Sequence, residues 1–301
     1  MLLGSVEAGG TKFVCAVGNE DFKVQESVTF PTTTPPEETL RKTLAFFKKF
    51  ADLKAIGVSS FGPIEIRKSS PKYGYITNTP KPGWKDTDFV NKLQASFPVP
   101  IAWTTDVNGS AYGEYIAYKK AGLQLSSLAY YTVGTGIGAG IVTDGKLVGS
   151  EGHPELGHVY LKRHSADLNF KGICPYHGDC LEGLASGPTF KARLGIAGQD
   201  VPLTDPTWNI IAYYVAQGVM QATLALRPSK IVIGGGVSSE AFLKKVRLHF
   251  KKLLNDYVAV GDLEQYIVTP KVPHNGSAIM GSLALALAEY QKSAQPKATN
   301  A

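Results

Sequence analysis

Cysteine and histidine side chains gather in one stretch of the chain. Residues 153–180 contain four of the six histidines and two of the three cysteines. Within this stretch, Cys174-Pro-Tyr-His177-Gly-Asp-Cys180 has the spacing Cys-x2-His-x2-Cys, and His158 lies sixteen residues before Cys174. Zn²⁺ takes four thiolate or imidazole ligands in a tetrahedron, and loops supply them at such spacings. The pattern predicts a structural zinc site made by His158, Cys174, His177 and Cys180.

Two other interpretations of these residues stay open. The cysteines could be free thiols beside ordinary polar histidines, or they could form a disulfide. The disulfide is disfavoured because the N-terminus has no basic stretch and enters an apolar run at once, which is unlike a secretory signal. We therefore expect a protein of the reducing cytoplasm.

A glycine turn near the N-terminus could bind an anion. Apolar residues 2–6 precede Glu7-Ala-Gly9-Gly10-Thr11-Lys12, and apolar residues 13–17 follow, which predicts strand, turn and strand. Paired glycines allow positive φ and can aim successive N–H groups at one anion, while Thr11 adds a hydroxyl and Lys12 a charge. The G-x4-G-K-[ST] pattern of a P-loop is absent. The motif predicts either a phosphate-binding turn or an ordinary tight hairpin.

The same pattern occurs a second time. A strand over 129–133 is followed by a glycine loop over 134–140, which contains Gly134-Thr135-Gly136, and by a strand over 141–143. The loop also matches the spacing G-x-G-x-x-A, but a dinucleotide site needs a helix there and a strand follows instead.

A third glycine cluster, Gly234-Gly235-Gly236-Val237, leads from a strand into a predicted helix over 241–254. Helix N-termini favour anions. The three clusters together predict two similar lobes that hold one nucleotide.

Asp106 follows a predicted strand and precedes a helix that is expected to begin near Asn108. Open α/β sheets bind ligands at the carboxyl ends of their strands. A carboxylate there could accept the proton of a hydroxyl that attacks a phosphoryl group. Asp is equally common as the N-cap of a helix, so both roles remain open.

These motifs, in this order, resemble the ROK-family sugar kinases of the actin/hexokinase-like ATPase superfamily, and among them the bacterial fructokinases. The resemblance extends over nearly the whole chain. It implies a two-lobed α/β fold, actin-like and related to ribonuclease H, with a zinc-binding loop. The implied activity is ATP-dependent phosphorylation of D-fructose to fructose 6-phosphate, with Mg²⁺ accompanying ATP and Zn²⁺ in a structural role.

The resemblance also implies roles for single residues. Asp106 would be the catalytic base, and Glu155-Leu-Gly-His158 matches the Glu-x-Gly-His signature of the family. The implied sugar ligands are Asn78, Asp106, Glu155, His158 and Glu182. The implied ATP ligands are Gly9, Gly10, Thr11, Lys12, Gly134, Thr135, Gly136, Gly234, Gly235, Gly236 and Val237.

Two positions depart from the family pattern. Glu7 stands where most ROK kinases have Asp, so its longer side chain is expected to hold Mg²⁺ through water. His177 stands where many ROK proteins have a cysteine, and a histidine there is consistent with the fructokinase branch of the family. Mannose or glucose remain alternative substrates. A sugar-sensing repressor is disfavoured, because the repressors of this family carry a DNA-binding helix-turn-helix ahead of the first phosphate loop, and Glu7 already lies at this loop. A non-catalytic sugar sensor is disfavoured because it would not need Asp106 beside two phosphate-binding turns.

Composition limits the partners. The 301 residues are 44% apolar and 19% charged with a net charge of +6, as in a globular protein. No apolar run is long enough to span a membrane, and the lysine doublets are typical of a solvated surface rather than a nucleic-acid site. We expect ATP and a hexose as partners, and a homodimer by default. The expected lobes are 1–113 and 114–281, with a C-terminal segment, 282–301, that returns to the first lobe.

Overall fold

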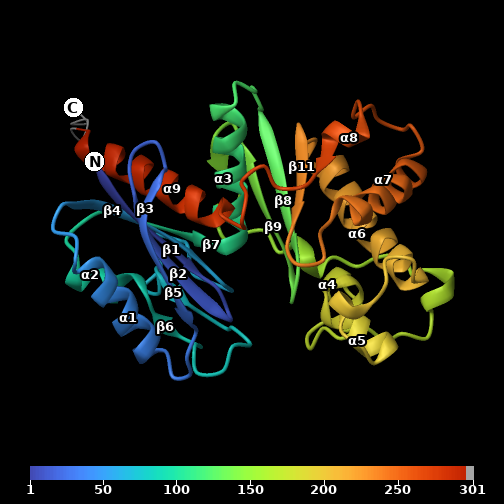
Figure 1. Ribbon diagram of the computed structural model, residues 1–301, viewed down its shortest axis with the longest axis horizontal. Coiled ribbons are helices and arrows are strands. Elements are labelled where there is room, and N and C mark those ends of the chain that lie inside the picture. Colours follow the sequence, from blue (N-terminus) through green and yellow to red (C-terminus); the bar gives the residue numbers. More distant parts are fainter. Residues whose placement is uncertain (296–301) are drawn as a thin grey trace. The chain divides into compact units, whose positions relative to one another are not determined.

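The computed structural model describes residues 1–295, which form two α/β units (Figure 1). Unit 1 comprises Met1–Ala117, Val148–His153 and the chain from Gly276 on, and unit 2 comprises Tyr118–Leu147 and Pro154–Asn275. These divisions differ from the expected ones at 113 and 281, because one helix continues past each of those positions. The last six residues of the predicted C-terminal segment lie outside the described part of the chain.

The sheet of unit 1 has the strand order β3-β2-β1-β4-β7. β1, β2 and β3 are antiparallel neighbours, while β4 and β7 run parallel to β1. The carboxyl ends of three strands therefore meet at one edge. The strands are β1 (Leu2–Ala8), β2 (Lys12–Gly18), β3 (Val24–Pro31), β4 (Leu53–Ser60) and β7 (Ile101–Thr105), and β5 (Tyr75–Ile76) pairs with β6 (Thr87–Asp88) in a separate small sheet.

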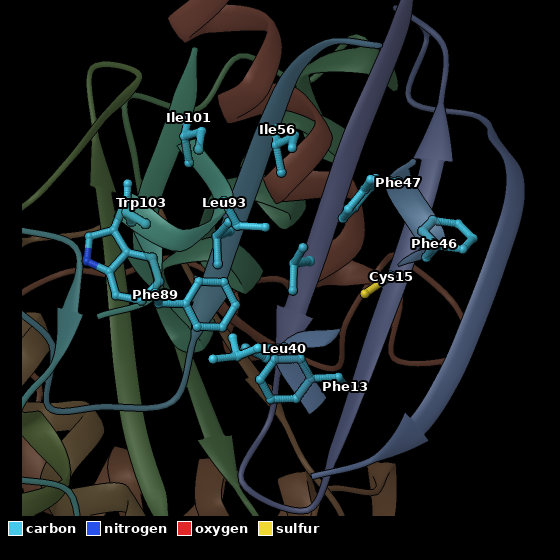
Figure 2. Packing of buried hydrophobic residues seen from close by; sticks show 14 of the residues in the cluster. Phe13, Cys15, Leu40, Phe46, Phe47, Ile56, Phe89, Leu93, Ile101 and Trp103 are labelled. Atoms are coloured by element: carbon cyan, nitrogen blue, oxygen red, sulfur yellow. The ribbon is translucent and has the colours of Figure 1, made fainter. Parts of the chain in front are cut away.

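One face of this sheet is covered by α1 (Glu37–Phe47) and α2 (Val90–Ser96) (Figure 1). Aromatic side chains fill the space between them (Figure 2). The ring of Phe13 lies 5.5 Å from that of Trp84 and 6.0 Å from that of Phe89. Such rings bury large apolar areas and dominate core energetics, so this layer forms the main core of unit 1.

The opposite face is covered by α9 (Ser277–Ala294), which begins five residues before the expected Ser282. Small residues bring the backbones together here. A Cβ on Gly57 would lie 1.9 Å from the carbonyl oxygen of Ser282, and one on Gly281 would lie 1.9 Å from that of Gly109. Gly109 belongs to α3 (Asp106–Lys120). Gly281 and Ser282 are therefore packing contacts inside α9 rather than its first residues.

The sheet of unit 2 has the order β10-β9-β8-β11-β12, with β8, β9 and β10 antiparallel and with β11 and β12 parallel to β8. Its topology repeats that of unit 1. The strands are β8 (Ser127–Val133), β9 (Ile137–Thr143), β10 (Lys146–Leu147), β11 (Lys230–Gly234) and β12 (Ile267–Val268). The expected glycine loop over 134–140 is shorter, because Gly138 and Gly140 pair with β8 as strand residues.

Helices of unit 2 pack around a long buried one. The hydroxyl of Tyr131, on β8, donates to the carbonyl of Gly218 on this helix at 3.0 Å.

No helix within residues 1–295 is both long and apolar enough to cross a membrane. The helices are α4 (Leu181–Ala185), α5 (Pro188–Leu194), the long α6 (Pro206–Leu226), α7 (Glu240–Leu254) and α8 (Leu263–Tyr266), with 3₁₀ turns at Leu156–His158, Ser165–Asp167 and Gly198–Asp200.

Candidate functional site

The first glycine turn joins β1 to β2 at the sheet edge of unit 1. The N–H of Gly9 donates to the carbonyl of Lys12 at 3.0 Å, and Thr32 holds the turn from the side through its hydroxyl, 2.6 Å from the carbonyl of Gly9. Thr11 and Lys12 are exposed. The turn is thus rigid on the protein side and presents its polar groups outward.

The expected reason for the paired glycines is wrong. Neither Gly9 nor Gly10 adopts a positive φ. A Cβ on Gly9 would lie 2.8 Å from the carbonyl oxygen of Lys12, whereas one on Gly10 would meet nothing within 4 Å. Gly9 is therefore needed by the turn itself, and Gly10 leaves open space above the backbone.

Glu7 lies beside this turn and is electrostatically coupled to Asp106. Glu7 on β1 is the register partner of Ser59 on β4, so the two side chains point to the same face of the sheet. A Cβ on Gly109 of α3 would meet the side chain of Ser59, so this is the face that α3 covers. Burial, and then the negative charge of Asp106, raise the pKa of Glu7 from 4.5 to about 7, and Lys12 offsets this in part. Two carboxylates near each other in a half-buried place favour a bound cation or a shared proton.

Asp106 is the first residue of α3, so the helix starts two residues earlier than expected. The N–H of Asn108 donates to the hydroxyl of Thr105 at 3.2 Å, which is the hydrogen bond of an N-cap. Asp106 accepts from the N–H of Val107 at 2.8 Å. The capping position is thus held by Thr105, and Asp106 follows it at the carboxyl end of β7.

Glu7→Gln is expected to stabilise the protein at pH 8 and to have little effect at pH 5. The folded-state pKa of Glu7 lies above its unfolded value, so its stabilising contribution is complete below about pH 4.5 and is lost as the pH rises through about 7. At pH 8 the ionised side chain costs at most about 3 kcal/mol, at 1.36 kcal/mol per pH unit. Denaturant titrations without nucleotide or magnesium measure this, and an equal gain at both pH values would contradict it.

Asn78 lies on a turn that backbone hydrogen bonds hold on both sides. The N–H and the hydroxyl of Thr77 donate to the carbonyl of Pro63 at 2.8 and 3.0 Å. The N–H of Thr79 donates to the carbonyl of Thr77 at 3.0 Å. Asn78 itself is exposed, so its amide can contact a ligand.

In unit 2, Glu182 and the Glu155–His158 signature lie beside the second glycine turn, Gly134–Gly136. The N–H of Ile137 donates to Oε2 of Glu182 at 2.9 Å, and a Cβ on Gly136 would lie 2.6 Å from the same oxygen. A Cβ on Gly157 would lie 1.7 Å from the carbonyl oxygen of Ile137. The Glu155–His158 signature and Glu182 therefore pack directly against this turn.

The third glycine cluster lies next to the second turn. The N–H of Val237 donates to the carbonyl of Val133 at 2.9 Å, and Gly235 has a φ of +89° because it bends closely around Val133. The N–H of Gly187 donates to the carbonyl of Gly134 at 2.7 Å. α7 begins directly after this cluster. Gly187 was not predicted from the sequence, where a lone glycine before a proline gives no sign of this contact.

The four predicted metal ligands come together. The ligand atoms of His158, Cys174, His177 and Cys180 all lie within 4.8 Å of one another. Nδ1 of His158 is 3.5 Å from the sulfur of Cys180 and 3.8 Å from that of Cys174, and Nδ1 of His177 is 3.7 Å from the sulfur of Cys174. The edges of a tetrahedron around Zn²⁺ with its usual bond lengths are about 3.3–3.8 Å. The cluster could hold a metal ion of this kind.

The segment between His158 and Cys174 is held by a buried ion pair between Asp167 and Arg193, which the sequence did not indicate. Asp167 accepts from Arg193 at 2.7 and 3.0 Å and from the hydroxyl of Tyr214 at 2.9 Å. Both members of the pair are less than a tenth exposed. Arg193 also donates to the carbonyl of Leu184 at 2.8 Å. This segment is thus tied to α4, α5 and α6 independently of a metal, by residues that are far apart in the chain.

Comparison with known proteins decides the family. The sequence matches the ROK family over residues 3–289. The chain belongs to the ROK family. The expected resemblance is thereby confirmed, and membership is consistent with the three glycine clusters and the Cys/His loop described above.

Two curated relatives of this ROK protein are fructokinases. The fructokinase of Streptococcus mutans is 55% identical over 289 residues, which are 95% of this chain and 97% of that protein. The fructokinase of Lactococcus lactis is 46% identical over 291 residues, 96% of this chain and 98% of that protein.

Solved structures confirm the fold class. A ROK-family glucokinase from Streptomyces griseus, determined with glucose and AMPPNP, superposes with a TM-score of 0.73 at 22% identity and covers 96% of this chain and 100% of its own. The two similar sheets of this ROK protein are therefore those of the actin-like ATPase fold.

Proposed function

We propose that this ROK protein is a fructokinase, which transfers the γ-phosphoryl group of ATP to D-fructose and forms fructose 6-phosphate. The observation that carries this proposal is the identity of 55% and 46% to fructokinases along nearly the full length of both chains. The alternative hexoses, mannose and glucose, and the non-catalytic sensor have no such support among these relatives.

Asp106 is the base in this proposal. It accepts the proton of the fructose hydroxyl while that oxygen bonds to the γ-phosphorus and the bond from phosphorus to the leaving ADP oxygen breaks. Its place at the carboxyl end of β7, with Thr105 as the helix cap, supports this role. Mg²⁺ bound with ATP would neutralise phosphate charge, and the Glu7–Asp106 carboxylates offer the oxygen donors that it prefers.

The glycine turns bind ATP in this proposal. The turns Gly9–Lys12 and Gly134–Gly136 bind phosphate oxygens through backbone N–H groups other than those of Gly9 and Gly134, which donate within their own turns. Thr11, Lys12 and Thr135 add side-chain donors. Gly234–Val237 receives the adenosine. The exposure of Thr11, Lys12, Thr135 and Gly236 supports this.

The sugar contacts Asn78, Glu155, His158 and Glu182 in this proposal, and the Cys/His cluster holds Zn²⁺. A metal ligand that binds through Nδ1 carries its proton on Nε2. Since Nδ1 of His158 faces the two sulfurs, Nε2 of this ring would be a donor to a sugar hydroxyl. Zinc would thereby fix both the position and the tautomer of a sugar ligand.

A coupled assay of ADP release tests the proposed function. Purified protein with Mg·ATP is supplied with fructose, mannose, glucose or N-acetylmannosamine. We expect the largest kcat/KM with fructose. A larger value with another hexose would replace fructose as the substrate, and no turnover with any of the sugars would favour the sensor. Light scattering on the same sample tests the expected homodimer.

Gly10→Val is expected to raise the KM for ATP at least about tenfold or to abolish turnover, without unfolding the protein. We expect the fold to tolerate the substitution, because a Cβ at Gly10 has nothing within 4 Å beyond its chain neighbours and the φ is not positive. The added side chain would fill only the space assigned to phosphate. Calorimetric titrations with ATP and with fructose separate the effects. Unchanged ATP affinity would show that the triphosphate binds elsewhere.

A further inference from the structure

His153 belongs to the histidine-rich stretch but not to the metal cluster. The cluster has its four ligands without it. His153 is the last residue of the short segment Val148–His153. This segment packs with unit 1, although the chain before and after it belongs to unit 2. The proposed function gives this half-buried imidazole no role.

The imidazole is held against the loop that follows β4. The N–H of Ile64 donates to Nε2 of His153 at 3.3 Å. A Cβ placed on Gly62 would be 3.6 Å from Cε1 of the ring, so the ring lies in van der Waals contact range of this glycine. Because Nε2 accepts a hydrogen bond, the ring is neutral in this arrangement.

This loop carries the Asn78 turn. Pro63, between Gly62 and Ile64, accepts both hydrogen bonds of Thr77, at 2.8 and 3.0 Å. Ile64 pairs with Ile76 in an antiparallel bridge. A displacement of Ile64 would therefore move the backbone on the N-terminal side of Asn78.

The other neighbour of His153 is the sugar-binding signature. Pro154 follows it, and Glu155 is the next residue. His153 thus fixes the chain two residues before Glu155 and, through Ile64, also holds the turn that presents Asn78.

We propose that His153 is a positioning residue for the hexose, which holds the Asn78 turn and anchors the chain that leads into Glu155. This inference rests on the proposed function, because Asn78 and Glu155 are sugar ligands only there. His153 itself need not touch the sugar. Its loss should act on sugar affinity rather than on ATP or on the chemical step.

The test compares three variants by steady-state kinetics and melting. His153→Ala removes the acceptor, and His153→Gln places an amide oxygen near the position of Nε2. His249→Ala is the matched control, because Nε2 of His249, on α7 of unit 2, is hydrogen-bonded to Oδ1 of Asn209 on α6 at 2.9 Å. All three are assayed with the hexose that the wild-type protein uses best.

We expect His153→Ala to raise the KM for the sugar about five- to tenfold, as the loss of one hydrogen bond in a binding site allows, with the KM for ATP and kcat within about twofold. His153→Gln should recover most of the sugar affinity, and His249→Ala should leave all three constants unchanged.

An unchanged sugar KM in His153→Ala would overturn the inference. So would equal defects in the Ala and Gln variants, or parallel increases of both KM values. Failure of the proposed function would appear instead in the wild-type protein, as a lack of turnover with every sugar.

Discussion

Asp106→Asn is expected to lower kcat about 10²–10⁴-fold, which is the usual cost of losing a positioned base. The amide keeps the size of the side chain and its hydrogen bond with the N–H of Val107, but it cannot take the proton of the sugar hydroxyl. The dissociation constant of fructose should change less than about threefold, because Asn can still hydrogen-bond the sugar hydroxyl and loses only the ability to accept its proton in the transition state. Single-turnover kinetics and fructose calorimetry measure the two quantities.

A matched variant separates catalysis from helix capping. Asp205 is the N-cap of α6 and accepts from the N–H of Thr207 at 2.8 Å. Asn caps helices as well as Asp, so Asp205→Asn should leave kcat and the melting temperature nearly unchanged. If Asp106→Asn behaved in the same way, Asp106 would be a structural residue and the reaction would need another base.

Cys180→Ala is expected to abolish the zinc binding that we propose for the Cys/His cluster and to lower the melting temperature by about 10 °C. A ligand present at about 1,000 times its dissociation constant stabilises by about 4 kcal/mol, and each kcal/mol shifts the melting of a unit of this size by about 2–4 °C. Because His158 shares the cluster with Cys180 at 3.5 Å, the KM for fructose should rise as well. Metal analysis, calorimetric melting and kinetics test this together.

Cys15→Ala is the matched control for the cysteine. Cys15 and Cys180 are both fully buried, so the two substitutions remove similar volumes, but Cys15 lies in unit 1 and its thiol has Thr43 as its hydrogen-bond partner at 3.9 Å. It should keep its metal and its fructose KM. Wild-type protein that contains no zinc after purification would contradict the assignment, as would a Cys180→Ala variant with wild-type melting and kinetics.

Short-range patterns located the glycine turns and the Cys/His cluster of this chain. The turn at Gly9–Lys12, the turn at Gly134–Gly136 and the cluster Cys174–Cys180 lie where strands end or where a tight loop brings ligands together. Each is encoded by fewer than about ten consecutive residues, so spacing and residue type are sufficient to find it. His158 lies sixteen residues before Cys174, and it was found because histidines and cysteines are concentrated in residues 153–180.

The physical reasons for particular residues were less accessible. Gly9, Gly57 and Gly157 have ordinary φ values and are required because a backbone carbonyl lies where a Cβ would be. A sequence shows that a residue is small, but it does not show which distant backbone approaches it. The same holds for Asp106, whose capping alternative was resolved by the hydroxyl of its neighbour Thr105.

The strand–turn–strand segments, the grouping of His158, Cys174, His177 and Cys180, and the ROK resemblance could all be read from the sequence, because they depend on local pattern and on the order of motifs. Other features appear only in the folded chain: Val148–His153 joins unit 1, Glu182 accepts from the N–H of Ile137 in the second turn, and Asp167 pairs with Arg193. These contacts join residues 26 to 89 positions apart. They form because packed layers bring distant polar groups out of water, where each must find a partner, and no local pattern encodes which partner that is.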